Sequence, residues 1–253
     1  MIKKIKYLIL AFSLIFNVLI CRAQSEFKFG ISMGPVVPIG DFKNIDNNSF
    51  NSGYAKTGFS LTVDGNYYIH NRVAISAAFH FGNSAIDGSL YSNRLYNELA
   101  AYLPPIEEKS EEVKFTINEW LWAAPLIGAK YNYPVSINKI YVEVGAFTGV
   151  SFTQIPDQNL FYLDGKNDRE ILSQNVEDKV ITVPIMLNGG IRFKINKRMQ
   201  FSITSEYYYT RVDFTHVSYI KLDNSVENTE LFKNSFSVPI RTINFKAGLI
   251  YNL

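Results

Sequence analysis

Cysteine and histidine are scarce in this sequence. Its single cysteine, Cys21, lies in the N-terminal segment, and the chain has three histidines. With one cysteine there is no intrachain disulfide and no cysteine-rich metal site. No two histidines stand at a metal-binding spacing, and no glycine-rich loop of the phosphate-binding kind occurs. The sequence therefore predicts no cofactor and no bound metal.

Long apolar runs are also missing after the first 23 residues. The longest, residues 120–129, is about half of the roughly 20 residues that a transmembrane helix needs, and it contains Pro125. In a bilayer, backbone polar groups are satisfied only within helices or closed β-barrels. If this chain enters a membrane, it therefore does so as strands.

The first 23 residues have the plan of a secretory signal peptide. A stretch with three lysines precedes an apolar run over Tyr7–Ile20, and a short polar exit follows. We expect cleavage between Ala23 and Gln24, which leaves one domain over residues 24–253. Two alternatives stay open. One is an anchor that is not removed, and the other is a lipoprotein with the lipid on Cys21.

Charge is low and balanced outside this segment. The segment holds four of the 25 cations and none of the 23 acids, so the remaining 21 cations and 23 acids give a net charge of −2. Such a balance provides no basic surface for a phosphate backbone. We therefore expect no nucleic-acid partner.

Alternation of apolar and polar residues dominates the rest of the chain. In the last segment, six apolar side chains fall on one face: Ile243, Phe245, Ala247, Leu249, Tyr251 and Leu253. A period of two with one apolar face is typical of a β-strand. Seven other segments also read as strands: 27–34, 59–67, 73–82, 118–131, 140–150, 182–193 and 199–209. Segment 118–131 is apolar on both faces. The sequence thus predicts eight strands.

The connections alternate between short and long. Three are short and polar, at residues 69–72, 132–139 and 195–198, and four are long, at residues 38–56, 84–114, 154–179 and 215–237. This arrangement predicts an antiparallel up-and-down barrel with short turns at one end and long loops at the other. Outer-membrane barrels have short periplasmic turns and long extracellular loops.

The polar face of the strands indicates which side of the barrel is apolar. That face carries mainly Gly, Ser, Thr and Asn, which suit a crowded interior better than a solvated surface. The apolar face carries Phe, Tyr, Ile and Val, with aromatic residues near strand ends where membrane girdles lie. We therefore expect an all-β transmembrane barrel. The alternative is a soluble barrel of the lipocalin kind, with its apolar face inside.

The chain resembles a known group of outer-membrane proteins. Its exported N-terminus, its eight alternating segments and stretches such as VPIMLNGGIRFKINKRMQFSITSEYYYT look like the outer-membrane β-barrel family of Bacteroidetes, which includes PorT-like proteins and is similar to small OmpA- and OmpX-type barrels. The final strand also looks like the signal read by the barrel-assembly machinery, although it ends in Leu253 rather than Phe. The resemblance implies an outer-membrane location and little about function.

Residues with catalytic or metal-binding chemistry are few. His216 lies close to Asp213 and Ser218, which would be a candidate hydrolytic set, but no flanking motif supports catalysis, and the three are better interpreted as ordinary polar loop residues. Acids gather at residues 107–112 and 157–170, where oxygen ligands could hold Ca²⁺, yet the spacing matches no calcium loop. We expect no catalytic residues.

Charged residues on the polar face are more informative. They are Lys28, Asp64, Lys130, Glu143, Arg192, Glu206 and Lys246. Unpaired charges in a narrow interior are costly, so we expect these residues to pair across the lumen. Four of them, Asp64, Glu143, Arg192 and Lys246, should share one level near the periplasmic strand ends. The alternative is a conducting or gated pore, although eight strands leave an interior just wide enough for side chains.

The sequence predicts a non-enzymatic outer-membrane protein, exported through the periplasm, that acts structurally or through its extracellular loops. The expected partners are outer-membrane lipid and, during biogenesis, the barrel-assembly machinery. Two other functions stay open. One is a PorT-like role in protein secretion, with envelope or secretion proteins as partners, and the other is a small pore or membrane-embedded enzyme.

Overall fold

The computed structural model describes the backbone of residues 26–44, 52–87, 111–117, 119–136, 139–156, 158–164, 169–175, 179–222 and 228–253. Side chains are described over 26–44, 52–87, 119–136, 139–156, 179–215 and 235–253. The expected signal segment 1–23, with the cleavage site between Ala23 and Gln24, lies outside these ranges. Within them, no helix is long and apolar enough to cross a bilayer.

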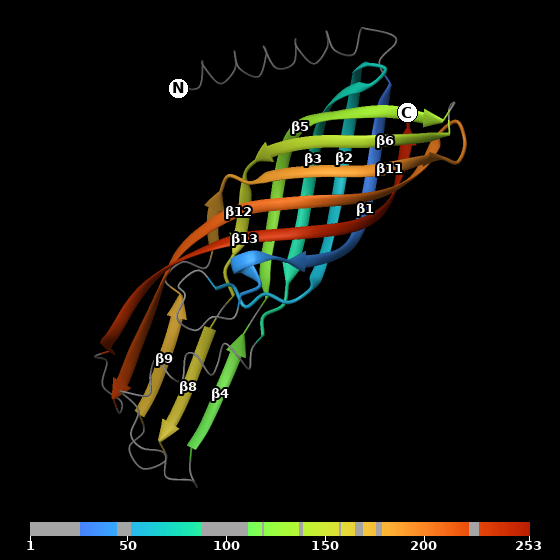
Figure 1. The fold of residues 1–253 in the computed structure, drawn as a ribbon. Helices are drawn as coiled ribbons and strands as arrows, with labels where there is room; N and C mark the ends of the chain where they lie inside the picture. The colour runs from blue at the N-terminus through green and yellow to red at the C-terminus, as the bar shows by residue number, and fades with distance from the viewer. Residues whose placement is uncertain are drawn as a thin grey trace, which may run out of the picture.

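Eight antiparallel strands close into a ring (Figure 1). They are β1 (Phe27–Pro38), β2 (Gly58–His70), β3 (Val73–Ser84), β5 (Trp120–Ser136), β6 (Ile140–Gly149), β11 (Ile185–Lys194), β12 (Met199–Leu222) and β13 (Asn228–Asn252). Each pairs with its neighbours along the chain, and β1 pairs with β13, as at Phe29 and Tyr251. The predicted eight-stranded up-and-down barrel is confirmed.

The strands are staggered around the ring. Following cross-strand partners once around the barrel leads from Phe27 to Val37, ten residues further along β1. The path passes through Tyr67, Ile75, Ala129, Ala146, Leu187, Tyr207 and Ile243. Such a stagger tilts the strands by roughly 35–45° and leaves an interior that side chains can fill.

The two ends of the barrel differ. Short turns join β2 to β3 and β11 to β12 at one end, called here the inner end, which is the periplasmic end in outer-membrane barrels. At the outer end, β7 (Ser151–Gln154) and β10 (Lys179–Thr182) continue β6 and β11 in the same register. The turn η1 (Gly40–Phe42) follows β1 there.

A sheet extension projects from the outer end, opposite the C-terminus (Figure 1). β12 and β13 stay paired far beyond the ring, up to Lys221 and Asn228. Three strands join this pair in the order β9 (Arg169–Asn175), β8 (Gln158–Asp164) and β4 (Glu111–Ile117). The sequence predicts long loops at 84–114, 154–179 and 215–237. That prediction is wrong in part, because strands occupy the end of the first range and parts of the other two. Outside a bilayer a strand needs no apolar face, so alternation does not reveal these strands.

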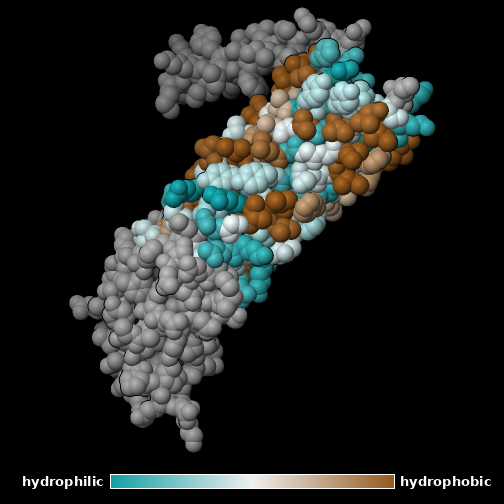
Figure 2. Space-filling view, viewed as in Figure 1, coloured by the Kyte–Doolittle hydropathy of each residue, from teal (hydrophilic) through white to brown (hydrophobic). Residues whose placement is uncertain are grey.

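The exterior of the ring is apolar. Large hydrophobic side chains on the outward face are exposed on every strand of the ring, for example Ile127 at 61% and Ile203 at 53%. On the side of the barrel that Figure 2 shows, hydrophobic residues are spread over the exposed surface. Aromatic residues meet at the inner end, where Phe27 pairs with Tyr67. The alternate positions face inward and are buried. This orientation confirms a membrane barrel rather than the lipocalin alternative, and a closed barrel with an apolar exterior resides in the outer membrane.

Candidate functional site in the barrel lumen

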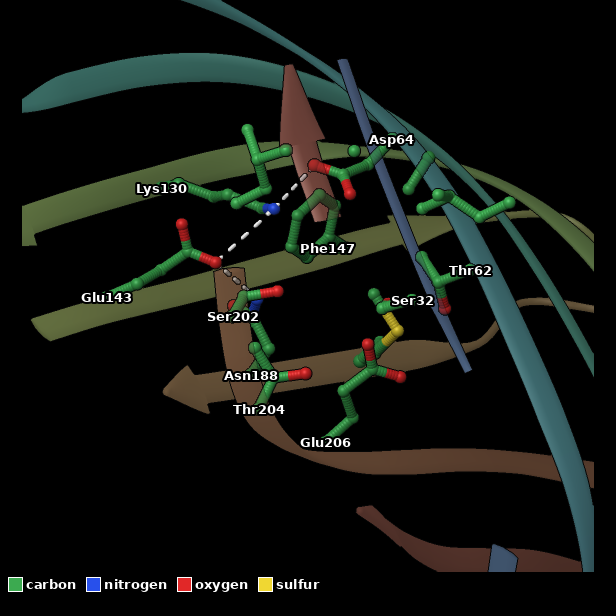
Figure 3. A pocket seen from close by; sticks show the side chains of 15 residues that line it. Ser32, Thr62, Asp64, Lys130, Glu143, Phe147, Asn188, Ser202, Thr204 and Glu206 are labelled. Carbon is green, nitrogen blue, oxygen red and sulfur yellow. Dashed lines mark hydrogen bonds and ion pairs between the residues drawn. The ribbon is translucent and has the colours of Figure 1, made fainter. Parts of the chain in front are cut away.

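The inner half of the lumen holds a buried chain of charges. Lys130 on β5 lies between two acids, with its Nζ 2.7 Å from Asp64 Oδ2 and 3.4 Å from Glu143 Oε1 (Figure 3). All three side chains are almost fully buried. Lys130 and its two acids come from three strands, β5, β2 and β6, so the charge chain ties together strands that are not all neighbours in the ring.

Arg192 on β11 extends this chain. Its guanidinium pairs with the Glu143 carboxylate, and its Nη1 donates a hydrogen bond of 2.8 Å to the Tyr68 hydroxyl. Asn132 donates to the same hydroxyl at 2.8 Å. Arg192 is 2% exposed and Glu143 is 1% exposed. Because both charges are shielded from water, each depends on the other for compensation.

The Asp64 oxygen that binds Lys130 has a second donor. Asn66 donates to Asp64 Oδ2 at 2.5 Å, and Ser76 donates to Asn66 Oδ1 at 2.7 Å. Alternation along β2 points Asp64 and Asn66 into the lumen, and the register with β3 brings Ser76 opposite Asn66. Lys130 and Asn66 thus donate to the buried carboxylate, and a buried charge requires such partners.

A second charged group lies around Lys246 on β13. Its Nζ is 2.6 Å from Glu206 Oε2 and 2.5 Å from the Thr62 hydroxyl. His80 Nδ1 lies 3.2 Å from Lys246 Nζ and 3.0 Å from the Thr62 hydroxyl. His80 and Lys246 are buried, with 0% and 2% exposure. Lys246 is therefore neutralised by Glu206, its diagonal neighbour across the β12–β13 pair.

The outer half of the lumen is filled by aromatic rings. His80 stacks on Tyr208 with ring centroids 5.0 Å apart, and Tyr208 stacks on Trp122 at 5.9 Å. The Tyr208 hydroxyl donates to Ser151 Oγ at 2.8 Å. Above them, Phe214 stacks on Phe236 at 5.3 Å. Apart from His80, these rings belong to one buried hydrophobic cluster, so aromatic side chains fill the lumen at this level.

The turn η1 closes the outer mouth of the lumen. It places Phe42 edge-on against both indoles, with ring centroids 5.7 Å from Trp120 and 6.3 Å from Trp122. Gly40 has φ of +58°, a left-handed conformation that costs glycine little and lets the chain fold back after β1. Trp120 Nε1 donates to the Gly53 carbonyl at 3.0 Å, which fixes the neighbouring loop.

Little empty space remains between these groups. A cavity of about 20 Å³ lies among Asp64, Lys130, Glu143 and Glu206, and Phe147 also lines it (Figure 3). A water molecule needs roughly 10–15 Å³ of such space, so the cavity accepts one or two waters and no larger solute.

The seven charged residues expected in the lumen fall into three sets. Asp64, Lys130, Glu143 and Arg192 form one chain, and Lys246 and Glu206 form a pair. Lys28 lies apart near the inner end, where its Nζ is 3.2 Å from Glu26 and 4.5 Å from the Tyr68 ring centre.

The sequence does not predict the aromatic rings in the outer half of the lumen, because most residues on the inward face of the strands are polar. A signal is nevertheless present in the inward positions of β12 and β13 near the outer end, such as Val212, Phe214, Phe236 and Val238, which are apolar although outward residues between them, such as Asp213 and Ser237, are polar. The two tryptophans on β5 also face inward, and they explain why 118–131 reads as apolar on both faces.

The other candidate sites gain no support from the described residues. Among these residues, no three histidines or acids come together as metal ligands would. Asp213 faces outward, accepts a hydrogen bond from Ser237 and lies 3.8 Å from Arg211. The side chains of His216 and Ser218, and those of the acids at 107–112 and 157–170, lie outside the described ones.

Comparisons with known proteins find likeness in structure alone. No protein-family model matches the sequence, and no curated protein matches it. Among solved structures, Neisserial surface protein A is 12% identical with a TM-score of 0.42, over 90% of this chain and 96% of that one. A major outer membrane protein from Thermus thermophilus is 12% identical with a TM-score of 0.45, over 91% and 100%.

Ail, the attachment invasion locus protein of Yersinia pestis, is 10% identical with a TM-score of 0.36, over 90% of this chain and 97% of that one. Scores at this level carry no function from those proteins to this chain. The assignment of the fold rests on the closed ring of strands and its apolar exterior. The chain is a small outer-membrane β-barrel of eight strands with an extended outer end.

Proposed function

We propose that this protein is a sealed, non-enzymatic barrel that holds a β-sheet extension outside the outer membrane. The proposal rests on the observation that two layers of side chains fill the lumen. The charged chain through Lys130 occupies the inner half, and the aromatic layer around Tyr208 occupies the outer half. A solute would have to disrupt both layers to pass.

The chemistry of the charged groups supports a structural role over an enzymatic one. A catalytic acid or base must reach a substrate within hydrogen-bond distance. Here Glu143 and Glu206 are bound to cations inside the barrel, and the cavity beside them has space for water alone. Their proposed task is to tie strands on different sides of the ring together.

The sheet extension is the proposed working part. β12 and β13 run from the barrel wall into the extension (Figure 1), with a shift of register at Ser218 and Tyr219, so the barrel wall positions the outer sheet. Surfaces held by a rigid scaffold are where binding usually resides. A partner outside the cell, or in the envelope, would meet this sheet first.

A second candidate is a PorT-like role in protein secretion, with an envelope or secretion protein as the partner. The observation in its favour is β4, which pairs with β8 and with no other strand among those described. An open strand edge can accept an extended peptide through backbone hydrogen bonds. Crosslinking from Thr116 on β4 in intact cells, followed by identification of the captured protein, would support this role if a secretion component is recovered.

Conductance of the purified protein in planar bilayers tests the sealed barrel. We expect no steady current at moderate voltage, because the lumen is filled. A matched variant, Phe42→Ala with Trp122→Ala, removes rings from the outer layer and should still not conduct, since the inner charges remain. A stable, ion-selective channel in the unmodified protein, with selectivity altered by Glu143→Gln, would contradict the proposal and establish a pore.

A further inference from the structure

The three short turns at the inner end carry positive charge and no acid. The turns, with the strand ends beside them, are residues 69–72, 133–139 and 194–198, and their five cations are Arg72, Lys139, Lys194, Lys197 and Arg198. Outside these turns, residues 24–253 hold the other 16 of 21 cations and all 23 acids, a net charge of −7. Positive charge is therefore concentrated at one end of a chain that is otherwise acidic.

Backbone hydrogen bonds place these turns beside one another. The N–H of Lys194 donates to the carbonyl of Lys139 at 2.8 Å, which joins the β11–β12 turn to the β5–β6 turn. The β2–β3 turn is joined to β5 in the same way, because the N–H of Asn132 donates to the carbonyl of Arg72 at 2.8 Å. The five cations therefore follow one another along the rim from β3 to β12, at the end of the barrel where the C-terminus lies (Figure 1).

The charge of these cations is not neutralised within the molecule. None of the ion pairs among the described side chains includes one of the five. Glu26 also lies at this end, but its partner is Lys28, at 3.2 Å. The carboxylate of Leu253 offsets one positive charge at most. All five cations are exposed, and the Arg72 guanidinium carbon lies 5.9 Å from the centre of the Tyr133 ring. Their charge therefore faces the surroundings of the barrel.

Each of the three turns also exposes an aliphatic side chain. Ile69 is 58% exposed, Val135 is 59% exposed and Ile195 is 58% exposed, and each stands within a few residues of a cation on its own turn. Aliphatic side chains are stabilised where they enter the apolar edge of a bilayer, and the long side chains of Lys and Arg reach the headgroups from the same level. The turns therefore have the composition of a surface that lies among lipid headgroups.

From this arrangement we infer that the inner turns form a docking surface for anionic phospholipids of the leaflet that faces the periplasm. The partner is a charged bilayer surface, so the cations need only lie at one level and need not converge on one anion. Each Lys or Arg close to an anionic leaflet adds to the attraction. The exposed aliphatic side chains favour a leaflet over a soluble polyanion, which would leave them in water. The inference does not depend on the sealed lumen, because a conducting barrel would carry the same turns.

Energy transfer from a dye on the protein to labelled lipids measures which headgroups gather at each end. In a Cys21→Ser background, the donor dye is attached at Asn71→Cys on an inner turn or at Ser235→Cys at the outer end. The protein is reconstituted in phosphatidylcholine with a minority of phosphatidylglycerol, and the acceptor dye is on an acyl chain of either lipid. From the inner dye we expect about twofold stronger transfer to phosphatidylglycerol than to phosphatidylcholine. From the outer dye we expect no preference.

Glutamine variants test whether the inner cations cause the preference. The inner variant combines Lys139→Gln, Lys194→Gln, Lys197→Gln and Arg198→Gln. The matched control removes four cations from the outer end, through Lys43→Gln, Lys56→Gln, Lys179→Gln and Arg211→Gln. With the inner dye, the inner variant should transfer almost equally to the two lipids, whereas the control should keep the preference. Heat-dependent migration on gels verifies that both variants fold.

Three results would overturn the inference: no preference for phosphatidylglycerol at the inner dye, an equal preference at both dyes, or a preference that the inner variant keeps. The first would point to a soluble acidic partner instead of a leaflet. If the inner variant fails to fold, salt replaces it. In 1 M sodium chloride the screening length falls to about 3 Å, so the preference of the otherwise unmodified protein should disappear. A preference that persists in this salt would contradict a docking surface made of charges.

Discussion

The two halves of the lumen are filled in different ways. In the inner half, Glu143, Lys130 and Arg192 form a chain of ion pairs, whereas in the outer half Trp122 and Tyr208 belong to a stack of rings. Ion pairs are directional and fail when one partner is lost. Aromatic packing is less directional, and it tolerates a change by partial collapse. The barrel thus combines a charged filling that depends on each partner with an aromatic filling that tolerates substitution.

The largest effect is expected in the charged half. Glu143→Ala leaves Arg192 buried without its carboxylate, and removing one partner of a buried pair costs about 3–5 kcal/mol. Urea unfolding of the reconstituted protein, followed by tryptophan fluorescence, measures the loss. Glu143→Ala combined with Arg192→Met should be more stable than Glu143→Ala alone. If the combined variant is the less stable of the two, the arginine does not depend on Glu143.

A somewhat smaller effect is expected in the aromatic half. Trp122→Ala removes a fully buried indole that contacts Tyr208 and Phe42, and such truncations cost about 3 kcal/mol when the site can partly collapse. The same urea unfolding measures it, with Trp120 as the remaining fluorophore. Trp122→Phe is the matched control and should keep most of the stability. A loss greater than that of Glu143→Ala would reverse the comparison between the halves.

Where the two halves meet, a moderate effect is expected. Tyr208 stacks on His80 on one side and on Trp122 on the other, and its hydroxyl bonds Ser151. Tyr208→Phe keeps the stacking and removes one hydrogen bond, which contributes about 1 kcal/mol. Chemical denaturation checks this value. A loss of several kcal/mol would mean that the hydroxyl, rather than the ring, joins the two halves.

The smallest effect is expected at the inner rim. The Lys28 side chain is 13% exposed, but its partner Glu26 is 69% exposed, so water screens the pair and it contributes about 0–1 kcal/mol. Lys28→Gln should therefore leave the unfolding midpoint nearly unchanged. Its matched comparison is Lys130→Gln, which affects the buried chain. Similar losses of stability for the two variants would show that Lys28 belongs to the buried chain of charges.

The ring itself could be predicted from sequence because the bilayer imposes a strict rule on it. Outward residues such as Ile185 and Phe245 must be apolar, so alternation is clear wherever a strand crosses the membrane. The sheet extension could not be predicted in this way. In β8 and β9 both faces lie outside the bilayer, and the physical demand that produces alternation is absent.

The charged lumen residues could be named from sequence, but their partners could not. Alternation places Asp64 and Lys130 on the inward face, yet the stagger of the ring decides which charges meet. Lys246 illustrates this. It lies on the strand next to Glu206 and pairs with that carboxylate rather than with Asp64. The role of His80, which links Lys246 to the Tyr208 ring, depends on contacts across the barrel that no local pattern reveals.

The pairing of β1 with β13 has a consequence for the order of folding. Gly30 meets Ile250 and Val37 meets Ile243, so the ring closes through the first and last strands of the barrel. Until residues near 250 are available, β1 and β12 each present an unpaired backbone edge, which hydrocarbon does not tolerate. Insertion must therefore follow synthesis of the whole ring rather than accompany it, and the chain needs protection from aggregation while it waits.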